Sequence, residues 1–228
     1  MSNTADLLAT TTPVSSSGAR WLTTRTNVKA AMRITTTDYD ALIDILIPQA
    51  SALIVGGCGL AVDKASSIAS FGTETLVATY RDRGLNRGEV LTLPWRVPVA
   101  SITTLTEDAV ALTAAAGDFE LVSTRPGKIR RLTDGSPTWW SSAAIVVTFT
   151  AGWSLPGSVP PDMEAAAIEQ VRAMVHAADR DPAIRSENVP DVAAVSYSQV
   201  GGDTFKGVLL PQVMAALSAA GYVNPMAI

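Results

Sequence analysis

The sequence predicts an α+β fold in which a small antiparallel β-domain interrupts a helical chain. Apolar residues recur at helical spacing up to about residue 60, alternate with polar residues from about 65 to 152, and return to helical spacing after 160. The 47% hydrophobic content of the 228 residues is enough for one large core or two small ones. We expect four parts: a flexible N-terminal arm (1–20), a helical bundle (21–60 and 156–184), an inserted β-domain (61–155) and an extended C-terminal segment (185–228).

The N-terminal arm is rich in Ser and Thr and lacks the basic start and apolar block of a secretory signal. Polar or charged residues also interrupt every apolar run well short of the ~20 residues that span a bilayer. We therefore expect a flexible arm, no membrane contact and a location inside a cell. Residues 21–34 then have the apolar spacing of a short helix, with Thr24 or Thr26 as its N-cap.

A longer helix should follow, because Thr37 and Asp40 form a variant of the capping box. Pro48 lies inside this helix, and its nitrogen cannot donate a hydrogen bond to the carbonyl of Asp44. We therefore predict a kink, or two shorter helices, before the glycine-rich end GGCG. The residues predicted to share the buried face are Leu42, Leu46, Ala50 and Leu53.

The central region predicts roughly five to seven strands. TLVATYR and AIVVTFTAG alternate most clearly, and shorter strands are expected at GEVLTLPW, ASITTLT, DFELVS and GKIRRL. The segment from Arg125 to Lys128 has proline and glycine where a type II turn needs them, so it should join two strands as a hairpin. The residues expected on the inner faces of the two clearest strands are Leu76, Ala78 and Tyr80, and Ile145, Val147 and Phe149.

Two adjacent tryptophans, Trp139 and Trp140, lie on a predicted strand or its approach. Neighbouring side chains of a strand face opposite sides, so one ring should lie on an exposed or partner-covered surface. We take both as candidate interface residues. The alternative is that the β-domain core holds one ring and a loop holds the other.

The C-terminal third begins with another helix. Pro160 and Pro161 restrict the backbone just before it, and we expect it to run to about Asp181. A polar segment with an extended stretch around 192–197 should follow. A last helix is expected over PQVMAALSAAGY.

No residues have the spacing of a catalytic, cofactor or metal site. His176 is the only histidine and Cys58 the only cysteine, which excludes an internal disulfide and a metal cage built from cysteines of one chain. Asp38, Asp40 and Asp44 lie close in sequence, but they lack the spacing of a calcium loop, and helix capping with solvation explains them. We expect no enzymatic activity, no cofactor and no metal.

Two groups of basic residues are candidates for contact with DNA or a protein partner. Neighbouring acidic residues partly neutralise both groups, and the formal net charge of −4 makes the chain a poor general binder of nucleic acid. The candidates are Arg81, Arg83 and Arg87 in one predicted turn, and Lys128, Arg130 and Arg131 after another.

The order of several short segments is more informative than any one residue. A helix ending VKAAMRI precedes DYDALIDILIPQASALI, a β-region with LPWRVPVASITTLT, a strand closing as VVTFTAGW, the corner VPPDMEAAAIEQVRAMV and a late LLPQVMAAL. Over about residues 21–221, this order resembles the head–tail connector (adaptor) proteins of long-tailed bacteriophages.

The resemblance implies a structural protein of the virion neck, made in the host cytoplasm, without enzymatic activity. Such proteins form a ring, usually of twelve copies, that docks under the portal protein and receives the stopper or tail-terminator protein. Viral DNA passes through the lumen without sequence specificity. Carried onto this chain, the ring wall would comprise about residues 38–55 and 162–181, and residues 185–228 would face the portal.

A ring subunit must hold its β-domain at a fixed angle to its helices. We therefore assign a junction role to Trp153, Pro156, Pro160 and Pro161, because prolines limit backbone freedom and the indole can pack across both parts. The charge is also uneven: residues 156–228 hold four basic and eight acidic side chains. We hypothesise that a ring would multiply this charge into a bore that repels DNA.

Two other interpretations stay open. The chain could be a different neck or tail-completion ring protein, or belong to a related gene-transfer particle. It could instead be a small-ligand-binding or enzymatic α+β domain whose site is assembled from scattered polar residues, although the sequence has no cluster of titratable groups that favours this.

Overall fold

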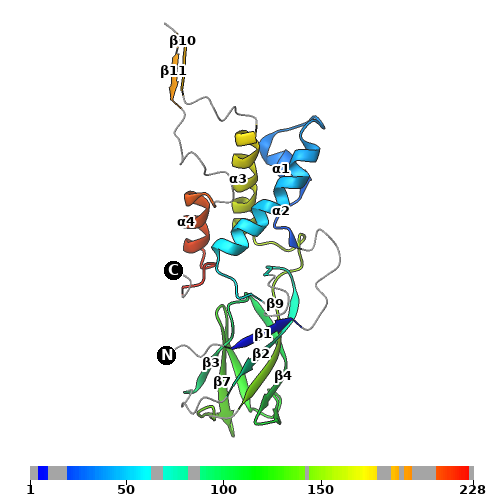
Figure 1. Ribbon diagram of the computed structural model, residues 1–228. Coiled ribbons are helices and arrows are strands. Elements are labelled where there is room, and N and C mark those ends of the chain that lie inside the picture. The colour runs from blue at the N-terminus through cyan, green and yellow to red at the C-terminus, as the bar shows by residue number, and fades with distance from the viewer. Residues whose placement is uncertain are drawn as a thin grey trace.

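The structure is a computed structural model. It describes residues 5–9, 20–62, 69–81, 88–141, 144–178, 186–189, 193–196 and 209–225. These residues form four α-helices and antiparallel β-sheets, which confirms the predicted α+β class. Figure 1 shows the strands β1–β9 gathered in one part, below, and the four helices in another, above. We call these the β part and the helical part.

The β part consists of two antiparallel sheets. One has the strand order β1 (Asp6–Ala9), β2 (Glu74–Tyr80), β9 (Ile145–Ala151), β4 (Val99–Glu107) and β5 (Val110–Leu112). The other has the order β3 (Val90–Thr92), β7 (Gly127–Thr133) and β6 (Phe119–Thr124), with β8 (Ser136–Pro137) also paired to β7.

The inner faces of the two sheets form one hydrophobic core. The alternation predicted for the two clearest strands is confirmed, since every second residue of β2 and β9 is buried. Leu91 of β3 and Ile129 of β7 reach the same core from the second sheet. The buried residues predicted from sequence are Leu76, Ala78, Tyr80, Ile145, Val147 and Phe149.

The hairpin between β6 and β7 is confirmed, but its predicted turn type is wrong. The two connecting residues are Arg125 and Pro126, joined by a cis peptide bond, as in a type VI turn. Gly127 already belongs to β7 and pairs with Thr124. A Cβ on Gly127 would lie 2.6 Å from Val99 Cγ2, so packing rather than turn geometry requires glycine there.

Three short strands were not expected from the sequence. β5 and β8 are three and two residues long, too short for an alternating pattern. β1 lies within the predicted N-terminal arm, where Asp6 pairs with Thr79 of β2 and extends the first sheet. The rest of the arm up to residue 19 lies outside the described residues.

The helical part is built around α3 (Pro161–Ala178). α1 (Arg25–Met32) and α2 (Asp40–Gly57) pack on it, and α4 (Pro211–Ala219) packs on it as well. The predicted N-cap Thr24 is confirmed, because its side chain accepts a hydrogen bond from the amide of Asn27. The apolar side chains between α1, α2 and α3 are Val28, Ile43, Leu46, Ile47, Ala50, Val171, Met174 and Val175.

α2 differs from its prediction at the start. It begins at Asp40 with Tyr39 as its N-cap, and Thr37 uses only its backbone carbonyl, which accepts from the Asp40 amide at 3.0 Å. Pro48 lies inside one continuous helix, so, of the two predicted alternatives, two shorter helices are not present in residues 40–57, and a kink stays a prediction. The glycine-rich end is confirmed.

The buried side of α2 is also rotated from the predicted face. Leu46 and Ala50 are buried as expected, but Ile43 and Ile54 take the places predicted for Leu42 and Leu53, which are only half-buried. Length and composition alone would allow α2 to cross a membrane, which the sequence did not lead us to expect. The same length and composition occur in core helices, and one side of α2 is buried against α3.

The C-terminal third adds a hairpin that was not predicted as such. β10 (Ser186–Val189) pairs with β11 (Ala193–Ser196), and β11 falls within the extended stretch expected around 192–197. We predicted that α3 ends near Asp181. That position lies outside the described residues, and α3 is described as far as Ala178.

Candidate functional site: the joint and the exposed surfaces

The chain crosses from the β part to the helical part at Trp153, one of the predicted junction residues. Its ring packs against Phe71, with ring centroids 5.6 Å apart, and against Tyr222, with centroids 5.9 Å apart in an edge-on arrangement. These rings belong to a cluster that includes Val97 of the β part and Met163 of α3. Trp153 therefore packs across both parts, and we call the surroundings of this cluster the joint.

Backbone contacts fix the position of Trp153. Its amide donates to the carbonyl of Phe71 at 2.8 Å, and its carbonyl accepts from the amide of Thr73 at 2.9 Å. Gly152 has a φ of +100°, and a Cβ there would lie 2.2 Å from the carbonyl oxygen of Gly72. Only glycine fits such a close approach, so the Ala-Gly-Trp sequence is a requirement of the joint.

The predicted junction prolines follow within a few residues. The Leu155–Pro156 peptide bond is cis, and Pro161 is the first residue of α3. Pro160 accepts a hydrogen bond from the amide of Glu164 at 2.9 Å, which begins the helical hydrogen-bonding pattern. A proline at the first helical position costs no hydrogen bond, because that amide would lack a partner within the helix.

A buried ion pair at the joint was not found from the sequence. Arg96, 2% exposed, donates to the Ser70 carbonyl at 3.0 Å and to Glu74 Oε2 at 3.1 Å. Arg20 lies 4.0 Å from the same carboxylate. One local signal of this pair was available in the sequence. Arg96 lies inside the apolar run PWRVP, and an arginine that is buried with such a run normally has an acidic partner.

Residues 220–224, which we call the closing segment, tie the joint together from the C-terminal side. The Asn224 amide donates to the carbonyl of Cys58 at 2.9 Å, and its side chain donates to the carbonyl of Gly59 at 3.2 Å. The Trp95 indole donates to the carbonyl of Tyr222 at 3.2 Å. The closing segment therefore contacts the end of α2 and the strand connection before β4.

Tyr222 also links the β6–β7 hairpin to α3. The guanidinium of Arg125 lies 4.3 Å from the centre of the Tyr222 ring and donates to the carbonyl of Ala220 at 3.1 Å. The Tyr222 hydroxyl donates to Asp162 Oδ1 at 2.9 Å. Burial and this hydrogen bond raise the pKa of Tyr222, so the phenol stays protonated.

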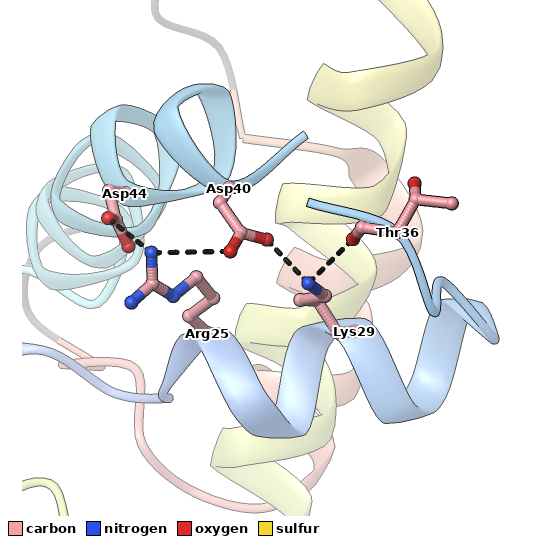
Figure 2. A network of polar contacts seen from close by, with 5 residues as sticks. All are labelled: Arg25, Lys29, Thr36, Asp40 and Asp44. Atoms are coloured by element: carbon pink, nitrogen blue, oxygen red, sulfur yellow. Dashed lines mark hydrogen bonds and ion pairs between the residues drawn. The ribbon is translucent and has the colours of Figure 1, made fainter. Parts of the chain in front are cut away.

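A charged network holds α1 against α2 (Figure 2). Arg25 reaches Asp44 at 3.0 Å and Asp40 at 3.6 Å, while Lys29 contacts Asp40 at 2.5 Å and the carbonyl of Thr36 at 2.7 Å. The two carboxylates that might have suggested a cation site are thus paired with cations of the chain itself.

The acidic start of α3 also bonds within the chain. Glu164 Oε1 accepts from Asn27 at 2.6 Å and from Thr23 at 3.2 Å, and Asp162 accepts from Tyr222. Both carboxylates therefore accept hydrogen bonds that join α3 to other segments of the same chain. Most of the other acidic side chains of the C-terminal third lie outside the described residues.

The first predicted basic group is only partly described. The Arg81 side chain is 74% exposed, and its Nε lies 3.1 Å from Asp6 of β1. Arg83 and Arg87 lie outside the described residues.

The second basic group divides into one exposed lysine and two paired arginines. Arg130 lies 2.9 Å from Glu120 on the surface of the second sheet. Arg131 is largely buried, lies 3.0 Å from Glu107 and donates to two carbonyls. Lys128 is exposed on β7, without an ion pair among the described residues. It is therefore the most accessible of the three.

The two adjacent tryptophans do face opposite sides. Trp140 is 2% exposed and joins the core of the β part, whereas Trp139 is 61% exposed. The exposed ring follows β8 at the second sheet. Large exposed aromatic rings are common at protein interfaces, so Trp139 is the better interface candidate of the pair.

The residues that could have supported catalysis are apart from one another. His176 is exposed in the last turn of α3, and Cys58 is buried at the end of α2, where burial raises the pKa of its thiol to about 12. Within the described ranges, no three side chains of His, Cys, Asp or Glu are grouped closely enough to hold a metal ion.

No protein-family model and no curated protein matches the chain. Solved structures do resemble it. A chain from the neck of an empty GTA particle, computed with C6 symmetry, matches over 96% of this chain and 95% of its own length, with 19% identity and a TM-score of 0.50. That likeness is one of fold, and it extends over both parts of the molecule.

Two further structures have TM-scores below 0.5. A chain in the virion of a native gene transfer agent (GTA) particle covers 90% of this chain and 95% of itself, with 18% identity and a TM-score of 0.48. A chain in the neck of a native GTA particle, computed with C12 symmetry, matches over 81% of this chain and 88% of its own length, with 20% identity and a TM-score of 0.45. The resemblance to neck proteins is confirmed at the level of the fold by the first structure.

Proposed function

We propose that this chain is a structural protein of the neck of a tailed phage or related gene-transfer particle, where it acts as a head–tail connector. The observation that carries the proposal is the shared fold with a neck protein over 96% of this chain and 95% of the other. Because the match covers nearly all of both chains, it includes the arrangement of a β part on a helical part and not one common domain alone.

The chain would act through shape and self-association. We propose a ring, of twelve copies by the phage resemblance, between the portal protein and the stopper or tail-terminator protein, with DNA passing through the lumen. The sixfold symmetry used for the neck that contains the similar chain is compatible with such a ring. About residues 38–55 and 162–181 would form its wall and residues 185–228 would face the portal.

The joint gives each copy the rigidity that such a role needs. Trp153 and the closing segment connect the two parts, and the Arg96–Glu74 pair holds together the β-part side of the joint. A ring built from such subunits presents every β part at the same angle. Lys128 and Trp139 are the accessible candidates for contact with the neighbouring layer or with DNA.

Electron microscopy of the purified protein, alone and mixed with the portal protein of the same particle, tests the proposal. We expect ring-shaped particles with a central channel, and a complex in which the ring lies on the portal. A monomer at every concentration, with no binding to the portal and saturable binding of a small molecule, would overturn it.

A further inference from the structure

The outer side of α2 carries almost no charge. Between Asp44 and Asp63 the sequence has no charged residue, and Asp44 itself is paired with Arg25. Ile45 on this side is 58% exposed. Helices on a protein surface normally place charged and polar residues outward. The exposed residues of this face are Ala41, Ile45, Gln49, Ala52 and Gly56.

The composition of α2 is that of a helix covered on all sides. It is apolar enough to span a membrane, yet only 39% of it is buried in the single chain. A helix that is apolar all round is normally enclosed by protein or lipid. Within the part of the chain that the structure describes, one side of α2 therefore lacks the cover that an apolar helix normally has.

A second helix has the same property. The sequence has no charged residue from 207 to 228, and the outer side of α4 is small and uncharged. Val213 and Leu217 on the opposite side of α4 are buried. The exposed residues of the α4 face are Pro211, Gln212, Ala215, Ala216, Ser218 and Ala219.

The two faces belong to different helices and are made of different residues. α2 and α4 both pack on α3, and the end of α2 also approaches α4, as Figure 1 shows; a Cβ on Gly57 would lie 3.6 Å from Met214 Sδ. A head-to-tail ring needs two different surfaces on each copy that match each other and lie on different sides. The uncharged faces of α2 and α4 are the candidates for these two surfaces, because they are made of different residues on different helices.

We propose that the outer face of α2 in one copy packs against the outer face of α4 in the next copy. The inference rests on the proposed function in assuming a ring, and it adds which helices meet. Small residues on both faces allow the helix axes to approach to about 8–10 Å. Neither face would bury a charge without a partner in this contact. Asp44, at the edge of the α2 face, stays paired with Arg25.

A lipid surface fits these faces less well than a second copy. Helices that lie on membranes carry lysine and arginine along their polar side. The exposed start of α2 instead has Asp44, and α4 has no charged residue at all. The second copy is therefore the occupant we choose, and binding to vesicles is an outcome of the test.

Cysteine cross-linking tests the pairing directly. Ala52→Cys lies on the α2 face and Ala215→Cys on the α4 face, both exposed. The native Cys58 is buried with its thiol pKa raised to about 12, so it adds no background. Under mild oxidation we expect the double variant to give a ladder of cross-linked oligomers. A mixture of the two single variants should give dimers, and neither single variant alone should.

The outcomes separate this inference from the proposed function. A ring seen by electron microscopy that gives no cross-link between 52 and 215 overturns the pairing and leaves the neck function standing. Dimers from a single variant alone overturn the head-to-tail arrangement. A protein that never oligomerises, with or without the portal protein, overturns both.

Charge variants give a second, independent readout. Ala52→Glu and Ala215→Glu should each raise the concentration for half-assembly by about tenfold or more, because they would bury an unpaired carboxylate. Ala116→Glu, exposed in the turn before β6, should leave assembly unchanged. Equal effects of all three variants would contradict the proposal, as would binding of the wild-type chain to phosphatidylcholine vesicles that Ala52→Glu abolishes.

Discussion

The β part and the helical part differ in how each encloses its core. In the β part the inner faces of two sheets close on each other, and the core residues of β2 and β9 are buried along their whole length. In the helical part α3 is covered on two sides, but α2 and α4 leave uncharged faces open. The difference indicates that the β part is stabilised within one chain, whereas in the proposed ring the helical part would gain stability from neighbouring copies.

The largest effect should come from the core of the β part. Phe149 on β9 is fully buried, so Phe149→Ala should lower the free energy of unfolding by about 3–5 kcal/mol. Urea denaturation of the monomer, followed by tryptophan fluorescence, measures it. A loss below about 1 kcal/mol would mean that the β part is not an independently packed unit.

The matched change in the helical part should behave in the opposite way. Ile45 is 58% exposed on α2, so Ile45→Ala should change monomer stability by no more than about 0.5 kcal/mol. Its effect should appear instead as weaker oligomerisation. If Ile45→Ala destabilised the monomer as much as Phe149→Ala, the contrast between the two parts would be wrong.

The joint should be nearly as sensitive as the core. Glu74→Ala would leave the guanidinium of Arg96 buried without its carboxylate, at a cost of about 3 kcal/mol. The matched control is Glu120→Ala, which breaks the exposed pair with Arg130 and should cost no more than about 1 kcal/mol. Thermal denaturation of both variants distinguishes them, and equal costs would show that the joint does not depend on the buried pair.

A smaller effect is expected at the closing segment. Tyr222→Phe removes the hydrogen bond to Asp162 while keeping the contacts of the ring with Trp153, so it should cost about 1 kcal/mol. Hydrogen exchange should show faster exchange around residues 58–61 and 220–224 and no change in β7. Faster exchange throughout the β part would contradict the local role of this contact.

The smallest predicted effect on stability depends on pH and involves Glu107 of β4. Burial by itself would raise the pKa of Glu107, but hydrogen bonds from Ser141 and Arg131 outweigh it and lower the pKa below the ordinary 4.5. The unfolded chain therefore takes up this proton first as pH falls. The stabilising contribution of Glu107 is complete above pH 4.5 and is lost as pH falls through the lower folded value.

The variant Glu107→Gln tests this linkage. Its melting temperature should fall less steeply than that of the wild type below pH 4.5, and it should already be lower at pH 7. Parallel curves for the two proteins over this range would show that the Glu107 carboxylate does not contribute to acid sensitivity.

Features with a local pattern could be predicted from the sequence. The inner faces of β2 and β9 follow from strict alternation, and the Thr24 cap and the glycine end of α2 follow from residue preferences. The same local reasoning failed where two signals competed. Thr37 has the composition of a cap, but the helix begins at Asp40, whose carboxylate pairs with Lys29 of α1.

Features set by distant contacts could not be predicted in the same way. Trp153 was identified because it follows a strand and precedes prolines, which is a local signal. Tyr222 and Asn224 have no such signal, and for Arg96 the one signal, its place in an apolar run, did not identify its partner. The partners of these three side chains lie at least 22 residues away along the chain. The sequence likewise left a kink and a helix break open at Pro48, and the structure shows one continuous helix there.

The place of the closing segment in the chain has a consequence for how a subunit matures. The segments of the joint run from Arg20 to Asn224, and residues 220–224 come after all the others. During translation the β part can fold as soon as residue 151 has left the ribosome, because all its strands have then been made. The contacts of Tyr222 and Asn224 at the joint form only when these two residues emerge, so under the proposed function a subunit would complete its joint only after nearly the whole chain has been translated.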